Sequence, residues 1–147
     1  MRLLKSAVAV LGMMLVMGMS DAVEAGDAQD TLVITARIVE IPGTFPPNDL
    51  YNYVYVMKYR VLSVVEGEYE GREIYVGHYN PRIPRAQIKD QMASVVAGDV
   101  ERFEVGAQQQ LTLVRPLGSV WNEATEDEFF DIDDDDKYFA IRADILK

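Results

Sequence analysis

The sequence contains no cysteine and only one histidine, His78, among its 147 residues. Without cysteine there can be no disulfide, no thiolate metal site and no cysteine nucleophile. A single imidazole excludes a zinc site built from several histidines, so a metal site in this chain would depend on carboxylates. Tryptophan also occurs once, at Trp121. Any functional site must therefore be built from carboxylates, tyrosines, hydroxyls and at most one imidazole.

Positive charge is scarce, because 14 Lys and Arg stand against 24 Asp and Glu and give a formal net charge of -10. The glycines are scattered singly, and neither G-x-G-x-x-G nor G-x-x-x-x-G-K occurs, which removes the usual phosphate-binding loops. No basic stripe with interleaved aromatic residues offsets the repulsion of phosphate backbones or of anionic lipid surfaces. We therefore expect no nucleic-acid partner.

A hydrophobic run long enough to span a bilayer is also missing. Arg2 and Lys5 precede an apolar stretch at residues 7–19, which is about 13 residues long against the roughly 20 that a membrane helix needs. Small residues follow, with Val23 and Ala25 in the positions of a signal-peptidase site. The pattern predicts a signal peptide at residues 1–25, export to the periplasm or the extracellular space, and no membrane insertion after cleavage.

The remaining residues, 26–147, are enough for one domain with a core and too few for two ordinary ones. Their apolar and β-branched patterning predicts a mainly β domain with five strands, at residues 31–41, 51–65, 72–79, 108–115 and 138–146. The first two strands are long, and the apolar phase of the first slips near Val39, which indicates a bulge. Between the third and fourth strands, Pro84, the spacing of Ile88, Met92 and Val95, and Gly98 predict a helix over residues 84–97.

Three strands, one helix and two strands is an order that resembles the OB-fold, a five-stranded Greek-key barrel. Residues 36–39 (ARIV) and 59–67 (YRVLSVVEG) are also similar to the first strands of netrin-type and metalloproteinase-inhibitor barrels. Those families use N-terminal cysteines, which this chain lacks, so the likeness implies the barrel and not the inhibitory chemistry. The OB resemblance implies that ligands lie on strands two and three, between the loops that join strands one to two and four to five.

Tyrosines are the most abundant residues of that expected face. Tyr53, Tyr55 and Tyr59 share a parity on the second strand, while Tyr75 belongs to the third. Tyrosine suits peptide and sugar ligands because its ring stacks and its hydroxyl forms hydrogen bonds. We expect these four tyrosines, together with Trp121 and His78, to form a ligand-binding surface. The alternative is that the rings belong to the barrel core and that His78 is a packed histidine.

The connection between the last two strands, residues 116–136, carries most of the net charge. It contains nine acids and no base, namely Glu123, Glu126, Asp127, Glu128, Asp131, Asp133, Asp134, Asp135 and Asp136. Loops of this length are usually functional or disordered, and Trp121, Phe129 and Phe130 predict that part of this one packs on the barrel. Asp131, Asp133 and Asp135 match the first ligand positions of an EF-hand loop, but Asp136 and Arg142 occupy its glycine and glutamate positions. A looser calcium site and a solvated acidic loop both stay open.

These features favour an exported, non-enzymatic binding module that recognises a peptide, protein or glycan, with no cofactor unless calcium binds. No nucleophile elbow surrounds Ser63, Ser94 or Ser119. Two alternatives are a small metal-dependent or carboxylate hydrolase that uses His78, and a structural component of the cell envelope. The sequence gives no oligomeric state.

Overall fold

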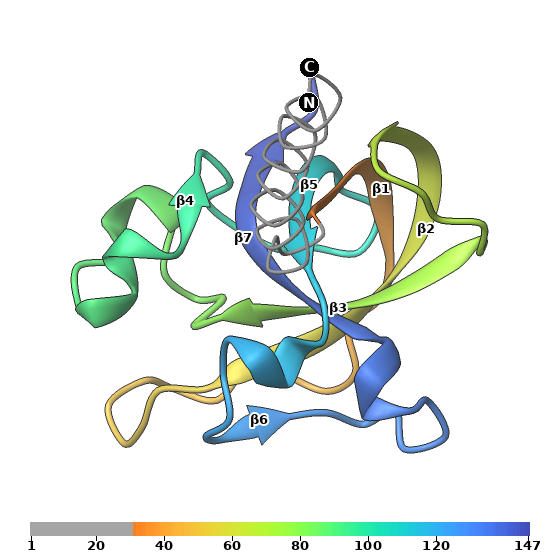
Figure 1. Ribbon diagram of the computed structural model, residues 1–147. Helices are drawn as coiled ribbons and strands as arrows, with labels where there is room; N and C mark the ends of the chain where they lie inside the picture. The colour runs from red at the N-terminus through yellow and green to blue at the C-terminus, as the bar shows by residue number, and fades with distance from the viewer. Residues whose placement is uncertain (1–30) are drawn as a thin grey trace, which may run out of the picture.

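The computed structural model describes residues 31–147, drawn in colour in Figure 1. The predicted signal peptide lies outside these residues. The described residues form seven strands: β1 (Thr31–Glu40), β2 (Val54–Glu66), β3 (Glu73–Tyr79), β4 (Ala97–Gly98), β5 (Gln108–Val114), β6 (Thr125–Glu126) and β7 (Lys137–Ile145). Four 3-10 turns lie between them: η1 (Arg85–Gln87), η2 (Gln91–Ser94), η3 (Leu117–Ser119) and η4 (Asp134–Asp136). Within this part of the chain, no helix is long and apolar enough to cross a membrane.

Five strands close into a small mixed barrel. β2 pairs antiparallel with β1 and β3, β5 pairs antiparallel with β1 and β7, and a parallel pairing of β3 with β7 completes the circle. The two short strands extend this sheet, since β6 pairs with the start of β2 and β4 pairs with the second half of β7. The mainly β class and all five long strands are confirmed.

Bulges bend the long strands around the barrel. On β1 the register with β2 shifts between Ile38 and Glu40, which places the extra residue at Val39 as the apolar pattern indicates. The register between β5 and β7 shifts between Thr112 and Leu113 of β5, which pair with Arg142 and Ala140 of β7 and so leave one extra residue on β7. Phe139 and Ala143 therefore pack in different clusters, although strict alternation would place them on one face.

The predicted helix over residues 84–97 is wrong, because the segment contains only the turns η1 and η2 followed by β4. Ile88 is extended and ends η1, while Asp90 starts η2 by accepting a hydrogen bond from the backbone N–H of Met92. The apolar spacing is used in part, since Ile88 and Met92 are buried, whereas Val96 is buried in place of the expected Val95, which is only partly buried. Burial of these side chains thus occurs through two short turns rather than through one continuous helix.

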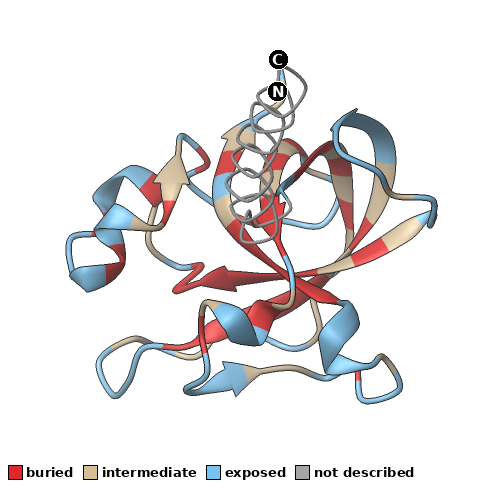
Figure 2. Cartoon of the chain, in the orientation of Figure 1, coloured by how far each residue is buried: buried red, intermediate tan, exposed pale blue. Residues whose placement is uncertain are grey.

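The structure has two hydrophobic clusters, one on each side of the barrel wall. The inner cluster fills the barrel and includes Ile34, Ile38, Met57 and Leu111. The outer cluster forms where the segments that carry η1, η2 and η3 cover strands β2, β3 and β7. It contains strand residues that point out of the barrel, namely Val54, Val56, Tyr79 and Phe139, and residues of the covering segments, among them Met92, Leu117, Trp121 and Phe129. Figure 2 shows the buried strands between the largely exposed turns that cover them.

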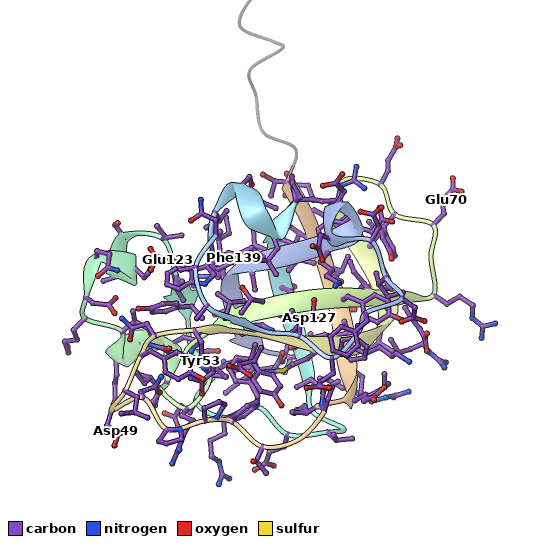
Figure 3. All side chains as sticks on the ribbon, turned by 90° about the horizontal axis from the view of Figure 1, so that it is seen from below. Asp49, Tyr53, Glu70, Glu123, Asp127 and Phe139 are labelled. Carbon is purple, nitrogen blue, oxygen red and sulfur yellow. The ribbon has the colours of Figure 1, made fainter. Side chains whose placement is uncertain are left out.

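The acidic connection is an ordered layer on the outside of the barrel. In Figure 3, which views the molecule from this side, Asp127 lies across the middle of the sheet, whereas Asp49 and Glu70 project at opposite ends. The carbonyl of Ala124 accepts hydrogen bonds from the backbone N–H of Val54 (3.1 Å) and from Trp121 Nε1 (2.8 Å), which fixes the connection to β2. The expectation that the connection folds back on the barrel is confirmed.

Several acids of this layer have structural partners. Lys137, which is almost fully buried at the start of β7, forms ion pairs with Asp127 and Asp134. Asp133 accepts a hydrogen bond from the backbone N–H of Asp135, and Asp136 lies 3.6 Å from Arg115. Although burial alone would lower the pKa of Lys137, its hydrogen bonds to Asp127 and Asp134 raise that pKa above its ordinary value. The run of aspartates therefore holds the first residue of the last strand.

Candidate functional site

The tyrosines predicted to bind ligand do not lie on one face. Tyr55 and Tyr59 of β2, and Tyr53 directly before it, belong to the inner cluster, and all three are buried. Register explains the separation, because Tyr55 is opposite His78 whereas Tyr75 is opposite Lys58, whose side chain points out of the barrel. The stripe expected to cross both strands is thus divided between the inside and the outside of the barrel, and ligand binding by these rings stays a prediction.

Trp121, which belongs to the acidic layer, and Tyr75, which the layer covers, are both packed against other rings. Trp121 is only 6% exposed and packs against Tyr79, with ring centroids 5.2 Å apart. Tyr75 is partly buried and contacts Phe129, with ring centroids 5.0 Å apart. The side of β2 and β3 on which the OB resemblance places a ligand is therefore covered by the chain's own residues.

The three aspartates considered for calcium do not converge. Asp131, Asp133 and Asp135 are exposed, and one carboxylate oxygen of Asp133 is already engaged by the N–H of Asp135. Within residues 31–147, no three His, Asp or Glu side chains are grouped so that they could hold a metal ion. Calcium binding at these residues stays a prediction.

His78 lies inside the barrel in a short polar chain. Its Nε2 is 2.8 Å from the hydroxyl of Tyr59, and that hydroxyl donates to Oε1 of Gln109 at 2.6 Å. Since the hydroxyl donates to Gln109, it accepts from His78, which leaves Nδ1 of the neutral ring without a proton. Nδ1 is buried and has no hydrogen-bond partner within the described residues. His78 is thus buried inside the barrel, as in the alternative that treats it as a packed histidine, and ligand binding by His78 stays a prediction.

Stability should depend on pH through His78. Burial lowers its pKa well below 6.5, and the neighbouring Arg85 cation lowers it further. An unfolded chain binds this proton below about pH 6.5 while the folded protein does not, so acidification costs up to about 1.4 kcal/mol per pH unit. The variant His78→Gln has no titrating group at this position. When the pH is lowered from 7 to 5, the unfolding free energy of the wild type should therefore fall relative to that of the variant. Urea denaturation of both proteins at both pH values measures this change. A difference in unfolding free energy between the two proteins that is the same at pH 7 and pH 5 would contradict a neutral His78.

A pocket with a volume of about 340 Å³ opens at one end of the barrel. We call it the mouth pocket, and it is lined by Ile41, Gly43, Thr44, Phe45, Arg82 and Phe103. Its walls come from three segments: the loop after β1, the connection from β3 to η1, and the connection from β4 to β5. Apolar pockets of this size at barrel mouths are common ligand sites. The only charged side chain in its lining is Arg82.

A set of hydrogen bonds around Asn80 holds the mouth pocket in shape. Asn80 has a left-handed backbone (φ 38°), and its Oδ1 accepts from Asn48 Nδ2 and from the backbone N–H of Tyr53. Its Nδ2 donates to Asn52 Oδ1, and its carbonyl accepts from Arg85 Nη2. Asn80 thus ties the loop that forms one wall to the end of β3. These polar contacts hold the segment that follows the wall of the pocket against the end of β3.

Phe103 separates the mouth pocket from His78 and Arg85. Its ring is largely buried and lies 4.3 Å from the His78 ring, centroid to centroid, while Arg85 Cζ is 5.2 Å from its centroid. Neither Phe103 nor Arg85 stands in a recognisable motif, and each is brought to the mouth only by the closure of the barrel. The sequence therefore carried no signal for them, although its loop at residues 42–49 was expected to border the site.

A second pocket, of about 500 Å³, is open and lies on the outside of β2 and β3. Its lining residues are Arg60, Arg72 and Glu73. All three are charged, whereas the mouth pocket, which is equally open, is lined by the large apolar side chains of Ile41, Phe45 and Phe103. The mouth pocket is therefore the better candidate site.

Comparison of the chain with protein families, with curated proteins and with solved structures found no match. A function must therefore be inferred from the residues of this chain and their geometry.

Proposed function

We propose that the protein is an exported, non-enzymatic binding module whose ligand site is the mouth pocket. The observation that carries this proposal is the pocket itself, in which Phe45 and Phe103 form apolar walls and Arg82 supplies one exposed cation. Apolar walls with few polar groups favour a side chain of a peptide or protein over a hydroxyl-rich sugar. A peptide or protein is accordingly the proposed ligand class, and a glycan is an outcome that the test distinguishes.

We also propose that the barrel is OB-like. The cyclic strand order β1, β2, β3, β7, β5, with its parallel pair β3 and β7, supports this proposal. In such barrels the loops between strands one and two and between strands four and five border the ligand. The first of these loops contributes Phe45 to the mouth pocket, while the second forms the acidic layer. The ligand site would thus be shifted from the sheet face to the barrel mouth.

The hydroxyl groups support binding rather than hydrolysis. Ser94 and Ser119 donate to the backbone carbonyls of Gln91 and Pro116, and Ser63 is paired with Thr35. His78, the one imidazole, is occupied at Nε2 by Tyr59, whose own pKa burial raises well above its ordinary value. None of these serines is therefore activated by a neighbouring base in the way that a Ser–His pair requires.

The test is a peptide and glycan array probed with the full chain and with a variant whose pocket is filled. Thr44 is exposed and lines the pocket, so Thr44→Trp should reduce binding at least about tenfold without loss of folding. Ala93→Trp adds the same ring at an exposed position of η2 and serves as the matched control. If both variants bind equally well, the mouth pocket is not the ligand site. If the protein binds only glycans on the array, the proposed peptide or protein ligand is wrong.

A further inference from the structure

Arg85 is a buried cation without a counter-ion. It is 2% exposed, and within residues 31–147 it forms no ion pair with any of the abundant acids. Its Nη2 donates to the carbonyls of Tyr79, Asn80 and Ile83 at 2.7, 2.8 and 2.9 Å. Its Nε and Nη1 are buried and have no partner among the described residues. The guanidinium is therefore positioned through one nitrogen while its other donors are unused.

An unpaired buried charge with unused donors is energetically costly. Removing a cation from water without a counter-charge is unfavourable, and each buried donor without a partner adds to that cost. Burial lowers the pKa of Arg85 to about 10. Three backbone carbonyls and the face of Phe103 offset only part of this cost. An anion beside Nε or Nη1 would remove most of it.

Phe103 lies between the mouth pocket and Arg85. The ring of Phe103 lines the mouth pocket and also contacts the guanidinium, so it is the side chain that the two sites share. The connection that carries it is anchored at its ends, where Val100 bonds to Ala143 and Gly106 bonds to Ile38. Between these anchors, Phe103 is held by ring contacts. A ligand group in the pocket would therefore require this ring to turn before it could contact Arg85.

We propose that Arg85, with Arg82 at the rim, binds the C-terminal carboxylate of a peptide whose last, apolar side chain occupies the mouth pocket. This inference rests on the proposed function and names the group that the site recognises. A carboxylate fits because a guanidinium presents planar donors to it, and because the neighbouring walls are apolar and suit a side chain on the same residue.

The only histidine is a direct reporter for this test. Because His78 is unique and its ring lies 4.3 Å from that of Phe103, its imidazole resonances are unambiguous and lie beside the proposed site. The probes are N-acetyl-Gly-Phe with a free carboxylate and the same dipeptide as the C-terminal amide, titrated at constant ionic strength. We expect a saturable shift of the His78 resonances with the free acid and at least about tenfold weaker binding of the amide.

Arg85→Lys is the decisive variant. A lysine keeps the positive charge but lacks the planar fork of donors at Nε and Nη1 through which the guanidinium would hold a carboxylate. We expect Arg85→Lys to bind the free acid about tenfold or more weakly, and Arg82→Gln to weaken it by a smaller factor. Arg72→Lys, at an exposed position outside the mouth pocket, should leave the affinity unchanged.

The outcomes separate this inference from the proposed function. If acid and amide bind equally well and Thr44→Trp abolishes both, the pocket binds peptides but the carboxylate site is overturned. If Arg85→Lys binds the free acid as the wild type does, the role of Arg85 is overturned. If neither dipeptide shifts the His78 resonances, the carboxylate site fails, while the array with Thr44→Trp still decides the function of the pocket.

Discussion

Gly98→Ala is expected to destabilise the protein by roughly 4 kcal/mol or more, a large part of the total stability of a domain of this size. Gly98 pairs with Ala143 across β4 and β7 and has a φ of +125°, a conformation that residues with a side chain rarely adopt. A Cβ atom at this position would lie 2.7 Å from the carbonyl carbon of Ala143 and closer still to its oxygen. Both atoms belong to backbone, so no side-chain movement can relieve the overlap.

Two other glycines serve as matched controls for this prediction. Gly106 also has a positive φ (+97°), but no heavy atom lies within 4 Å of a Cβ placed there, so Gly106→Ala should cost only the backbone strain, about 1 kcal/mol. At Gly118 the space is open and φ is not positive, and Gly118→Ala should be nearly neutral. Thermal and urea denaturation of the three variants measure the order. A loss at Gly98 no larger than at Gly106 would contradict the close approach of β4 to β7.

The role of Gly98 also explains how far the sequence could predict the fold. Strands of seven or more residues were recognisable because β-branched and apolar patterning repeats over their whole length, and even the bulge at Val39 left a phase slip. The segment at residues 84–97 has helical spacing, yet Asp90 caps a new turn and Gly98 is required by its approach to Ala143. That approach is between residues distant in sequence, and no local pattern encodes it.

The candidate site was harder to predict than the fold. Parity on each strand was read correctly, but whether Tyr55 lies on the same side as Tyr75 depends on the register between β2 and β3. A shift of the register by one residue moves every side chain of a strand to the other face. The tyrosines of the two strands were therefore predicted to lie together, although the barrel wall separates them. Arg85 depends on barrel closure in the same way, because its neighbours Tyr59, His78 and Phe103 come from three different segments.

Trp121→Ala is expected to cost about 3–5 kcal/mol and to release the acidic layer from the barrel. The indole is buried in the outer cluster against Tyr79, and its Nε1 shares the carbonyl of Ala124 with the backbone N–H of Val54. Truncation to alanine removes this contact and leaves a cavity that the short turns around it cannot fill. Hydrogen exchange should show early loss of protection at Val54, whose amide bonds to the layer, before β5 and β7 open.

The matched control for Trp121 is Phe130, which is 82% exposed in the same layer. Phe130→Ala should change the unfolding free energy by less than about 0.5 kcal/mol. The comparison also decides between two roles for the tryptophan, since a ligand-binding Trp121 could be removed with little loss of stability and a large loss of affinity. Reduced stability, together with unchanged binding of the free-acid dipeptide under conditions in which the variant is folded, would assign Trp121 to the attachment of the acidic layer. In that case the nine acids are held against the barrel by a tryptophan at one end and by the ion pairs of Lys137 at the other.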